Sequence, residues 1–339
     1  MEKKFGFGVI GTGNIAKFHS QCINKIPNAK LLGVLSKTES RARQVAKDFN
    51  APVFWDIEKL LSNSEIDIVC ICNESGLHAH SIAKIAKAGK NVLCEKPLET
   101  SVKKIDEIGD IAKASGIQLG CVFQNRENPE YKKLKTYVQS GSLGKILLCQ
   151  TSINWYRPPS YYEDSWRGTL AMDGGAALIN QGIHTVDLTL DLMGEVDHLS
   201  GFIATLHHQI EGEDVAVAAL KFKSGALGTL SAGTALFPGE PESITLYGTL
   251  GNVVFSGGKI ITSTVVSIQE ELNATLVDPG SGASDPMAIS DQFHIATIED
   301  FMNAVQHRRP PRVNIDQARK SVAVINAIYE SKGNKVKFN

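Results

Sequence analysis

Short apolar runs and helical patterns alternate along the first third of the chain. The apolar runs predict strands, and the amphipathic segments between them predict helices. The predicted strands cover residues 5–10, 29–35, 53–54, 66–71, 91–94 and 117–123. The predicted helices cover residues 14–25, 40–49, 57–62, 77–88 and 101–114. Strand–helix alternation at this spacing predicts an α/β fold with a doubly wound, parallel sheet of the Rossmann type.

A different pattern begins after residue 123. It predicts a helix over 129–140, a long strand over 145–155 and a helix over 174–193. From 196 to about 266, apolar and polar residues alternate between glycine turns, which predicts an antiparallel sheet. A flexible loop over 278–286 and helices at about 288–307 and 316–331 follow. We therefore predict two domains, the Rossmann-type α/β domain over 1–123 and an α+β domain with a large, open, mostly antiparallel sheet over 124–339.

A glycine-rich turn links the first predicted strand to the first predicted helix. It reads Gly11, Thr12, Gly13, Asn14, Ile15 and Ala16, a G-x-G-x-x-A pattern in strand–helix context. The first glycine permits the tight turn, the second lets a pyrophosphate approach the backbone, and the alanine allows close helix–strand packing. The helix N-terminus offers N–H groups and a favourable dipole to a phosphate. The pattern predicts dinucleotide binding, with a plain tight turn as the alternative.

The end of the second predicted strand bears on the choice of cofactor. An NAD-selective site usually has Asp or Glu there to hold the ribose hydroxyls. This chain has Ser36, followed by Lys37 and Arg41, whose charges suit a 2′-phosphate. We expect NAD(P) as the cofactor and favour NADP. Solvated charges at a helix start are the alternative reading of the two cations.

A Glu-Lys-Pro sequence follows the predicted strand 91–94. It lies at the carboxyl edge of the parallel sheet, where ligands bind in such folds. The Lys96 ammonium there suits the task of holding a hydroxyl and stabilising charge during hydride transfer, with Glu95 orienting it and Pro97 making the turn rigid, in the cis form if the turn requires it. A surface ion pair in a turn is the alternative.

A second cluster lies in the predicted helix 174–193. Asn180 and His184 are four residues apart and therefore share one helix face. Because imidazole titrates near neutral pH, His184 is a candidate acid/base for an alcohol. Asn180 would position the hydroxyl, and Asp187 would orient the ring. A satisfied helix histidine is the alternative.

The segment 155–167 is dense in aromatic residues and arginines. Planar rings stack on sugar faces, and arginines bind hydroxyls, carboxylates or phosphates. The candidate substrate contacts here are Tyr156, Arg157, Tyr161, Trp166 and Arg167. A dimer contact or a packed surface loop is the alternative.

The composition limits the classes of partner that we expect for this protein. The 339-residue chain is 42% hydrophobic and 21% charged with a formal net charge of −1, so no overall basic field favours nucleic acid. No stretch approaches the ~20 apolar residues that span a bilayer. The six cysteines lack the spacing of metal or redox pairs. We therefore expect no metal, no nucleic acid, no membrane and a reduced, cytoplasmic protein.

Taken together, these motifs resemble the Gfo/Idh/MocA family, which includes glucose–fructose oxidoreductase and inositol dehydrogenase. The resemblance extends over essentially the whole chain and rests on the segments GTGNIAKFH, GLHAHSIAKIAKAGKNVLCEKPL, WYRPPSYYEDSWRGTLAMDGGAALINQGIHTVDL and HIATIEDFMNAV. It implies that Lys96 and His184 are the catalytic pair, with Asn180 beside them. It implies cofactor contacts at Gly11, Gly13, Ser36, Lys37, Cys72, Asn73, His78, Glu95, Gln124 and Asn125, and it makes His294 a candidate substrate contact. It also implies that the open sheet joins subunits into a homodimer or homotetramer.

Two departures from the family pattern matter. Many members have Asp four residues before the catalytic histidine, where this chain has Asn180. That departure resembles the branch acting on nucleotide sugars, including UDP-N-acetylglucosamine-type 3-dehydrogenases. The usual Thr-Pro before the helix 77–88 is Asn73-Glu74 here, which bears on the geometry at the nicotinamide edge.

The sequence thus predicts an NAD(P)-dependent oxidoreductase. It would transfer hydride between nicotinamide and a ring secondary alcohol of a sugar, a sugar derivative such as a nucleotide sugar, or a cyclic polyol. Two alternatives stay open: a glycosidase that holds NAD tightly and oxidises its substrate transiently, and a non-catalytic dinucleotide-binding sensor.

Overall fold

The computed structural model describes residues 3–163, 165–265, 268–269 and 291–338. Its contacts divide the chain into two compact units. Unit 1 comprises Met1–Gln124 and Asp291–Arg319, and unit 2 comprises Asn125–Ser290 and Lys320–Asn339. The first boundary falls within one residue of the predicted one. The segment 291–319, predicted to belong to the second domain, makes its contacts in unit 1.

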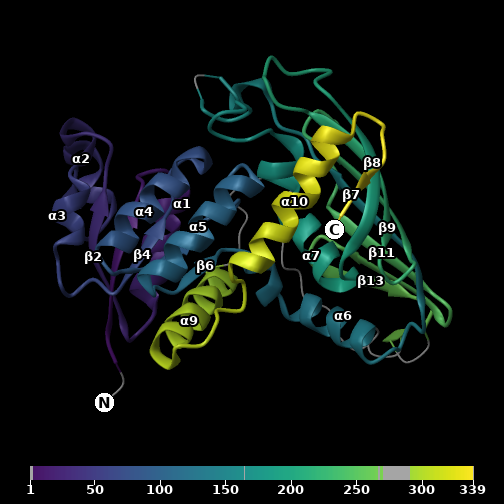
Figure 1. Ribbon diagram of the computed structural model, residues 1–339, viewed down its shortest axis with the longest axis horizontal. Helices are drawn as coiled ribbons and strands as arrows, with labels where there is room; N and C mark the ends of the chain where they lie inside the picture. The colour runs from purple at the N-terminus through teal and green to yellow at the C-terminus, as the bar shows by residue number, and fades with distance from the viewer. Residues whose placement is uncertain (1–2, 164, 266–267, 270–290, 339) are drawn as a thin grey trace. The chain divides into compact units, whose positions relative to one another are not determined.

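Unit 1 is built on a six-stranded parallel sheet in the order β3-β2-β1-β4-β5-β6 (Figure 1). Its strands are β1 (Phe5–Ile10), β2 (Ala29–Leu35), β3 (Val53–Phe54), β4 (Ile68–Ile71), β5 (Asn91–Cys94) and β6 (Leu119–Cys121). Its helices are α1 (Asn14–Lys25), α2 (Glu39–Val45), α3 (Ile57–Leu61), α4 (His78–Lys87), α5 (Val102–Ser115) and α9 (Asp291–His307). Every residue of β1 and β4 is buried, because helices cover both faces of the sheet. The predicted doubly wound sheet is confirmed.

Helix α9 joins unit 1 through its apolar face. Ile298, Phe301 and Met302 belong to the same buried cluster as Phe5 and Phe7 of β1. A side chain at Gly120 of β6 would meet the Phe301 ring at 2.8 Å, so the glycine allows this close approach. The helix is therefore part of the core beneath the parallel sheet.

Unit 2 contains an eight-stranded sheet in the order β13-β12-β11-β7-β10-β9-β8-β14. Its strands are β7 (Ile146–Asn154), β8 (Val196–Ala204), β9 (Val215–Phe222), β10 (Leu227–Gly233), β11 (Ser243–Gly248), β12 (Gly251–Ser256), β13 (Lys259–Ser263) and β14 (Val336–Lys337). Only the pair β7–β10 is parallel among the described strands of this sheet, which confirms the mostly antiparallel prediction. Helices α6 (Pro129–Gln139) and α7 (Ile183–Met193) belong to unit 2, as does α10 (Ile315–Ser331) from residue 320 onward.

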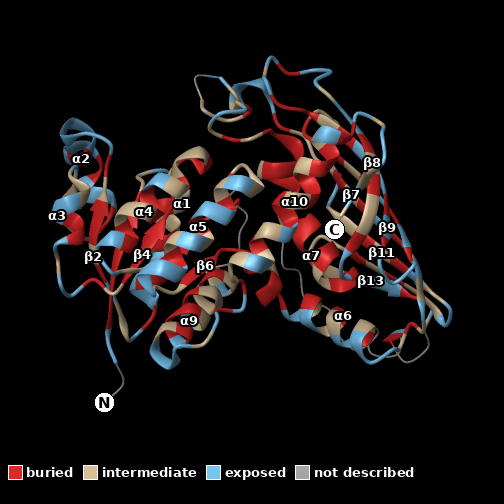
Figure 2. Ribbon diagram, viewed as in Figure 1, coloured by how far each residue is buried: buried red, intermediate tan, exposed pale blue. Residues whose placement is uncertain are grey.

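One face of this sheet is covered and the other is open. Buried and exposed residues alternate along β9, as a sheet with one covered face requires. Thr151 of β7 and Thr189 of α7 share a 2.9 Å hydrogen bond, which places α7 on the covered face. In Figure 2 the buried residues follow the strands and the inward sides of the helices.

One predicted helix differs in the structure, and one predicted loop cannot be compared with it. The single helix predicted over 174–193 is a π-helical turn, Ala177–Gly182, followed by α7. The predicted flexible loop at 278–286 lies outside the described residues. No helix in the described ranges combines the length and apolar character needed to cross a membrane.

Candidate active site

The glycine turn between β1 and α1 has the geometry that a pyrophosphate requires. Gly11 has a φ of 120°, and a side chain there would lie 2.6 Å from the carbonyl oxygen of Cys72. A side chain at Gly13 would meet no atom within 4 Å, so the space over this backbone is open. Gly13 is the N-cap of α1 and gives the helix no side-chain cap. The N–H groups of Asn14 and Ile15 in the first turn therefore suit an incoming phosphate, with Thr12 completing the loop.

Buried polar atoms at the carboxyl edge of the sheet support a ligand there. Ser36 Oγ, Asn73 Oδ1 and Gln124 Oε1 are buried and have no hydrogen-bond partner among the described residues. They follow β2, β4 and β6, whose carboxyl ends share one edge of the parallel sheet. Because burying polar atoms unsatisfied is costly, their arrangement fits a polar ligand such as a dinucleotide.

The cations predicted to meet a 2′-phosphate are both exposed. The Lys37 ammonium forms an ion pair with Glu74, which replaces the proline of the usual Thr-Pro sequence. The Arg41 guanidinium donates to Gln44 on the next turn of α2, 3.1 Å away. Lys37 therefore already has an anion beside it, which a 2′-phosphate would have to displace.

His78 lies between the two turns that flank the predicted nicotinamide position. Its Nδ1 lies 2.9 Å from the carbonyl oxygen of Pro97, and its Nε2 lies 3.2 Å from that of Asn73. Burial lowers the pKa of His78, so the ring is neutral at pH 7 and donates through one nitrogen. The Lys96–Pro97 peptide is cis, one of the two forms considered for this turn. His78, predicted as a cofactor contact, thus lies between the Asn73 and Pro97 turns and donates a hydrogen bond to one of the two carbonyl oxygens.

Glu95 is the buried anchor of the Lys96 turn. One carboxylate oxygen, Oε1, accepts a 2.7 Å hydrogen bond from His19 Nε2 of α1, and the other, Oε2, accepts the backbone N–H of Lys96 at 3.1 Å. Burial alone would raise the pKa of Glu95, but the hydrogen bond from His19 holds it well below its usual range. The carboxylate therefore stays ionised and ties Lys96 to the helix that begins at the glycine turn.

His294 lies in the same cluster. It belongs to α9, is almost fully buried, and has its Nε2 3.8 Å from Glu95 Oε1. Its ring packs edge-on against Phe18, with centroids 4.8 Å apart. The family resemblance makes His294 a candidate substrate contact, whereas the structure gives it partners in the core of unit 1, beneath the Lys96 turn.

Ligand atoms of His19, Glu95 and His294 lie within 4.8 Å of one another, the spacing of a metal site. The sequence predicts no metal. Two ligands on one zinc ion stay about 3.3 Å apart, as zinc–ligand distances of about 2.0–2.1 Å require. The 2.7 Å separation of His19 Nε2 and Glu95 Oε1 is a hydrogen bond instead. We therefore interpret the cluster as a hydrogen-bonded support for Lys96.

In unit 2, a buried glutamate caps the segment that carries Asn180 and His184. The Glu213 carboxylate accepts the backbone N–H groups of Ala176 at 3.1 Å and Leu178 at 2.7 Å. The Tyr329 hydroxyl donates to it at 2.9 Å. These bonds satisfy N–H groups at the start of the π-helical turn. A side chain at Gly175 would meet Glu213 at 2.8 Å, so the glycine makes room for the cap.

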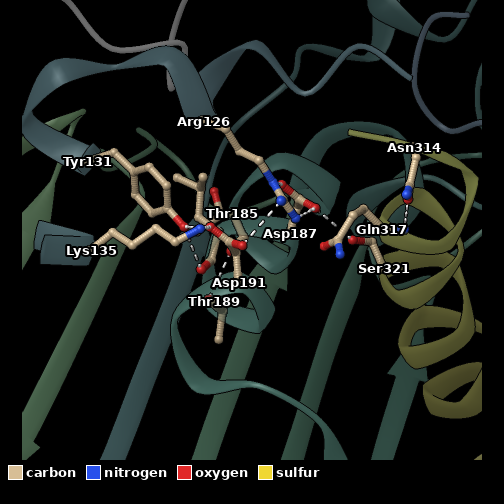
Figure 3. Close-up of polar contacts among 11 residues, drawn as sticks. Arg126, Tyr131, Lys135, Thr185, Asp187, Thr189, Asp191, Asn314, Gln317 and Ser321 are labelled. Atoms are coloured by element: carbon tan, nitrogen blue, oxygen red, sulfur yellow. Dashed lines mark hydrogen bonds and ion pairs between the residues drawn. The ribbon is translucent and has the colours of Figure 1, made fainter. Parts of the chain in front are cut away.

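A network of charged side chains joins α7 to Arg126 and to helix α6 (Figure 3). The Arg126 guanidinium donates to both oxygens of Asp187, at 2.7 and 2.8 Å, and to Asp191 at 3.1 Å. Tyr131 and Lys135 of α6 also donate to Asp191, at 2.5 and 2.7 Å. Asp187, predicted to orient the His184 ring, is thus bound to Arg126 because it faces the core of unit 2. The network fixes the helix on which His184 lies in the first turn.

The Asn180 side chain belongs to a second network. Its amide nitrogen donates to Asp173 Oδ1 at 2.6 Å, and its amide oxygen accepts from Gln181 at 2.9 Å. Because residues 177–182 form a π-helical turn, the four-residue spacing to His184 crosses a change of helix type and does not define one α-helical face.

The predicted substrate loop is ordered by its own arginines. Arg157 is 1% exposed, and its guanidinium donates to Gln181 at 2.8 and 3.2 Å. Arg167 stacks near the rings of Tyr161 and Trp166, at 5.0 and 5.3 Å from their centroids. Tyr156 packs edge-on against Phe237, with ring centroids 5.2 Å apart. Within unit 2, the side chains of Tyr161 and Trp166 are partly exposed, whereas the Arg157 guanidinium is buried against Gln181.

Two models of one protein family match the chain. An oxidoreductase-family model, described as an NAD-binding Rossmann fold, matches residues 5–123, and the GFO/IDH/MocA C-terminal domain matches residues 131–254. Together they match well over half of the 339 residues. The chain belongs to the GFO/IDH/MocA family of oxidoreductases. The resemblance inferred from the sequence is confirmed.

Named relatives and solved structures agree with this membership. This GFO/IDH/MocA protein is 29% identical over 271 residues to myo-inositol 2-dehydrogenase of Thermotoga maritima, covering 78% of each chain. It is 27% identical to the WlbA dehydrogenase of Bordetella pertussis, solved in complex with NADH and UDP-GlcNAcA, with a TM-score of 0.87 and 99% of each chain covered. A levoglucosan dehydrogenase solved with NADH and L-sorbose has a TM-score of 0.84 at 20% identity, with 100% of each chain covered, which is a likeness of fold.

Sequence analysis did not identify several residues of this site. His19 pairs with a residue 76 positions away, Arg126 with one 61 positions away, and Glu213 with an N–H group 35 positions away. Asn125, predicted as a cofactor contact, lies in the short helix Gln124–Glu127 that brings Arg126 to Asp187. The sequence clue to Arg126 was that its charge lies next to Asn125, a predicted cofactor contact. That Arg126 binds Asp187 is shown only by the structure.

Proposed function

We propose that this GFO/IDH/MocA-family enzyme transfers hydride between a nicotinamide cofactor and a ring secondary alcohol of a sugar, sugar derivative or cyclic polyol. The observation that carries the proposal is the support of Lys96. Its turn follows β5 at the edge of the sheet, and Glu95 binds both its backbone N–H and His19 of the helix that begins at the glycine turn. Hydride acceptance is the chemistry that NAD(P)+ supplies when bound.

In this proposal Lys96 and His184 serve the same reaction. The Lys96 ammonium holds the substrate hydroxyl and stabilises negative charge that develops on its oxygen. His184 takes the hydroxyl proton during oxidation and returns it during reduction. Asn180 positions the substrate through its amide. Trp166, Tyr161, Tyr156 and Arg167 are proposed to meet the rest of the substrate, because aromatic rings and guanidinium groups bind sugars and their anionic substituents.

The cofactor preference is proposed to depend on Lys37. We favour NADP, because Ser36 replaces the acidic residue of an NAD-selective site and its buried hydroxyl has no partner among the described residues. The ion pair with Glu74 restrains Lys37. Glu74→Gln is therefore expected to lower the KM for NADP several-fold with little change for NAD, and Lys37→Ala to raise it. Equal effects on both cofactors would contradict this assignment.

Nucleotide sugars are the substrate class that we propose first. The WlbA dehydrogenase structure, 27% identical to this chain, contains UDP-GlcNAcA. Asn180 also stands where many family members have Asp, the departure that resembles the branch acting on nucleotide sugars. Cyclic polyols are the second class, given the 29% identity to myo-inositol 2-dehydrogenase.

We also propose that the open face of the unit 2 sheet joins two copies of the chain. Pairing places Phe202, Val217, Ser231 and Ser152 in one row across β8, β9, β10 and β7. Phe202 and Val217 are 62% and 48% exposed. A broad face of apolar and small side chains suits packing against its own copy. The six cysteines are free and buried, which fits the proposed cytoplasmic location.

The decisive experiment follows absorbance at 340 nm with NAD+ or NADP+ and a panel that includes UDP-GlcNAcA and myo-inositol. Stoichiometric reduction of the nicotinamide supports the dehydrogenase. Release of a sugar product without net change at 340 nm would show the glycosidase alternative. Tight NADH binding with no turnover across the panel would favour the sensor.

A further inference from the structure

A chain of hydrogen bonds in unit 2 runs from a buried cation to a buried carboxylate. Arg157 donates to Gln181 Oε1 at 2.8 Å, Gln181 Nε2 donates to Asn180 Oδ1 at 2.9 Å, and Asn180 Nδ2 donates to Asp173 Oδ1 at 2.6 Å. The Gly168 N–H donates to the other Asp173 oxygen at 2.8 Å. Arg157 and Asp173 are 1% and 0% exposed.

The two charged ends fix the direction of every bond between them. A guanidinium only donates and a carboxylate only accepts. Gln181 must therefore turn its oxygen to Arg157, and Asn180 must turn its nitrogen to Asp173. Neither amide has a second orientation that satisfies both of its neighbours. Gln181 Nε2 also donates to the Tyr161 hydroxyl at 2.8 Å. The same series of hydrogen bonds therefore orients Tyr161, which is proposed to contact the substrate.

We propose that Asp173 and Arg157 are positioning residues that set the orientation of the Asn180 amide. One of the two positions 173 and 180 must carry a carboxylate and the other an amide, and in this protein the carboxylate is at position 173. The consequence is a neutral, fixed amide at the position proposed to meet the substrate. This part of the inference rests on the proposed function, whereas the pairing of 173 with 180 does not.

A single substitution at position 173 or 180 should leave at least one hydrogen bond of this series unsatisfied. In Asp173→Asn, the new amide oxygen still accepts from Gly168, so its nitrogen faces the Asn180 nitrogen, two donors in contact. Asn180→Asp places two carboxylates 2.6 Å apart, where like charges cannot both ionise without cost. The exchanged pair, Asp173→Asn with Asn180→Asp, satisfies every bond, because the carboxylate introduced at position 180 accepts both from Gln181 and from the amide introduced at position 173.

The experiment is a double-mutant cycle on the full-length enzyme, with thermal unfolding from pH 5 to 9, NADH binding, and kcat and KM for UDP-GlcNAcA and myo-inositol. Each single variant should lower the Tm by about 5 °C at pH 8, and D173N/N180D should regain most of it. The N180D loss should shrink toward pH 5, as one carboxyl takes a proton. The KM for whichever of these two substrates the enzyme turns over should rise about tenfold in the D173N variant, with NADH affinity unchanged.

Two results would overturn the proposal. A double variant no more stable than the sum of the single changes would show that positions 173 and 180 do not require one carboxylate and one amide. A double variant that regains stability, with the KM for that substrate equal to wild type in D173N, would refute the positioning role. Absence of turnover of both UDP-GlcNAcA and myo-inositol by the wild type would instead count against the proposed function, and the stability cycle would still decide the pairing.

Discussion

A buried carboxylate at position 95 determines how the neighbouring lysine is held. Glu95 accepts one hydrogen bond from His19 and another from the backbone of Lys96. A buried carboxylate that loses a donor keeps its desolvation cost, so the His19 bond contributes more than an exposed ion pair would.

We therefore expect His19→Ala to lower the free energy of unfolding by about 2 kcal/mol and to reduce kcat. His19→Gln, whose amide nitrogen can donate from a similar position, should retain most of both. Denaturant unfolding and steady-state kinetics test this, with exposed His80→Ala of α4 as the control. Wild-type stability and kcat in His19→Ala would show that Glu95 does not need this donor.

Single residues were predictable where the chemistry is local. The places of Gly11, Gly13 and Lys96 were predictable because these residues lie next to strand ends, and their roles stay predictions. The partner of Asp187 was not predictable, because Arg126 reaches it from 61 residues away. Helix spacing identified the neighbours of Asp187 on its own helix and carried no information on the core that it faces.

At the scale of elements, the support of α7 depends on charge. Arg126, Tyr131 and Lys135 all donate to Asp191. Burial alone would raise the pKa of Asp191, but the Arg126 charge and these hydrogen bonds hold it below its usual value. A carboxyl group whose pKa is lower in the folded state stabilises the protein above its unfolded pKa of about 3.9 and loses that contribution as the pH falls.

The stability difference between wild type and Asp191→Asn should therefore be full at about pH 6–7. It should decline as the pH falls below about 4. Chemical unfolding at a series of pH values measures this, with exposed Asp110→Asn as the control for general charge effects. A difference that stays constant through the acid range would contradict the assigned role of the Asp191 carboxylate.

Element boundaries in unit 1 followed closely from the apolar pattern, because parallel strands buried on both faces read as continuous apolar runs. The π-helical turn Ala177–Gly182 was not predictable. Glu213, whose carboxylate caps this turn, comes 35 residues after Leu178, so the local sequence does not contain the cap.

For the whole molecule, two domains were predictable, but the return of α9 to unit 1 was not. Its contacts join the first strand of the chain to a helix near residue 300, and an amphipathic pattern does not specify which core a helix enters. The open sheet of unit 2 was predictable only in outline. The exposed positions of β9, which are Val217, Ala219 and Lys221, include apolar residues, so residue type alone does not separate its two faces.

If two copies pack through that open face, a charge at its centre should separate them. Val217→Arg is expected to shift the mass measured by light scattering toward the monomer. Leu250→Arg, at an exposed leucine in the turn between β11 and β12, serves as the control and should leave the mass unchanged. A monomeric wild type, or an unchanged mass in Val217→Arg, would exclude this face as the interface.

The central claim is that Lys96 and His184 are the side chains that assist hydride transfer to the nicotinamide, Lys96 at the substrate oxygen and His184 at its proton. Its most direct test is the initial rate of nicotinamide reduction at 340 nm by wild type, Lys96→Met and His184→Ala, with the best substrate of the panel. NADH affinity is measured on the same preparations. We predict at least about a hundredfold loss of rate in both variants with NADH binding preserved. Near wild-type rates in both variants would contradict the claim.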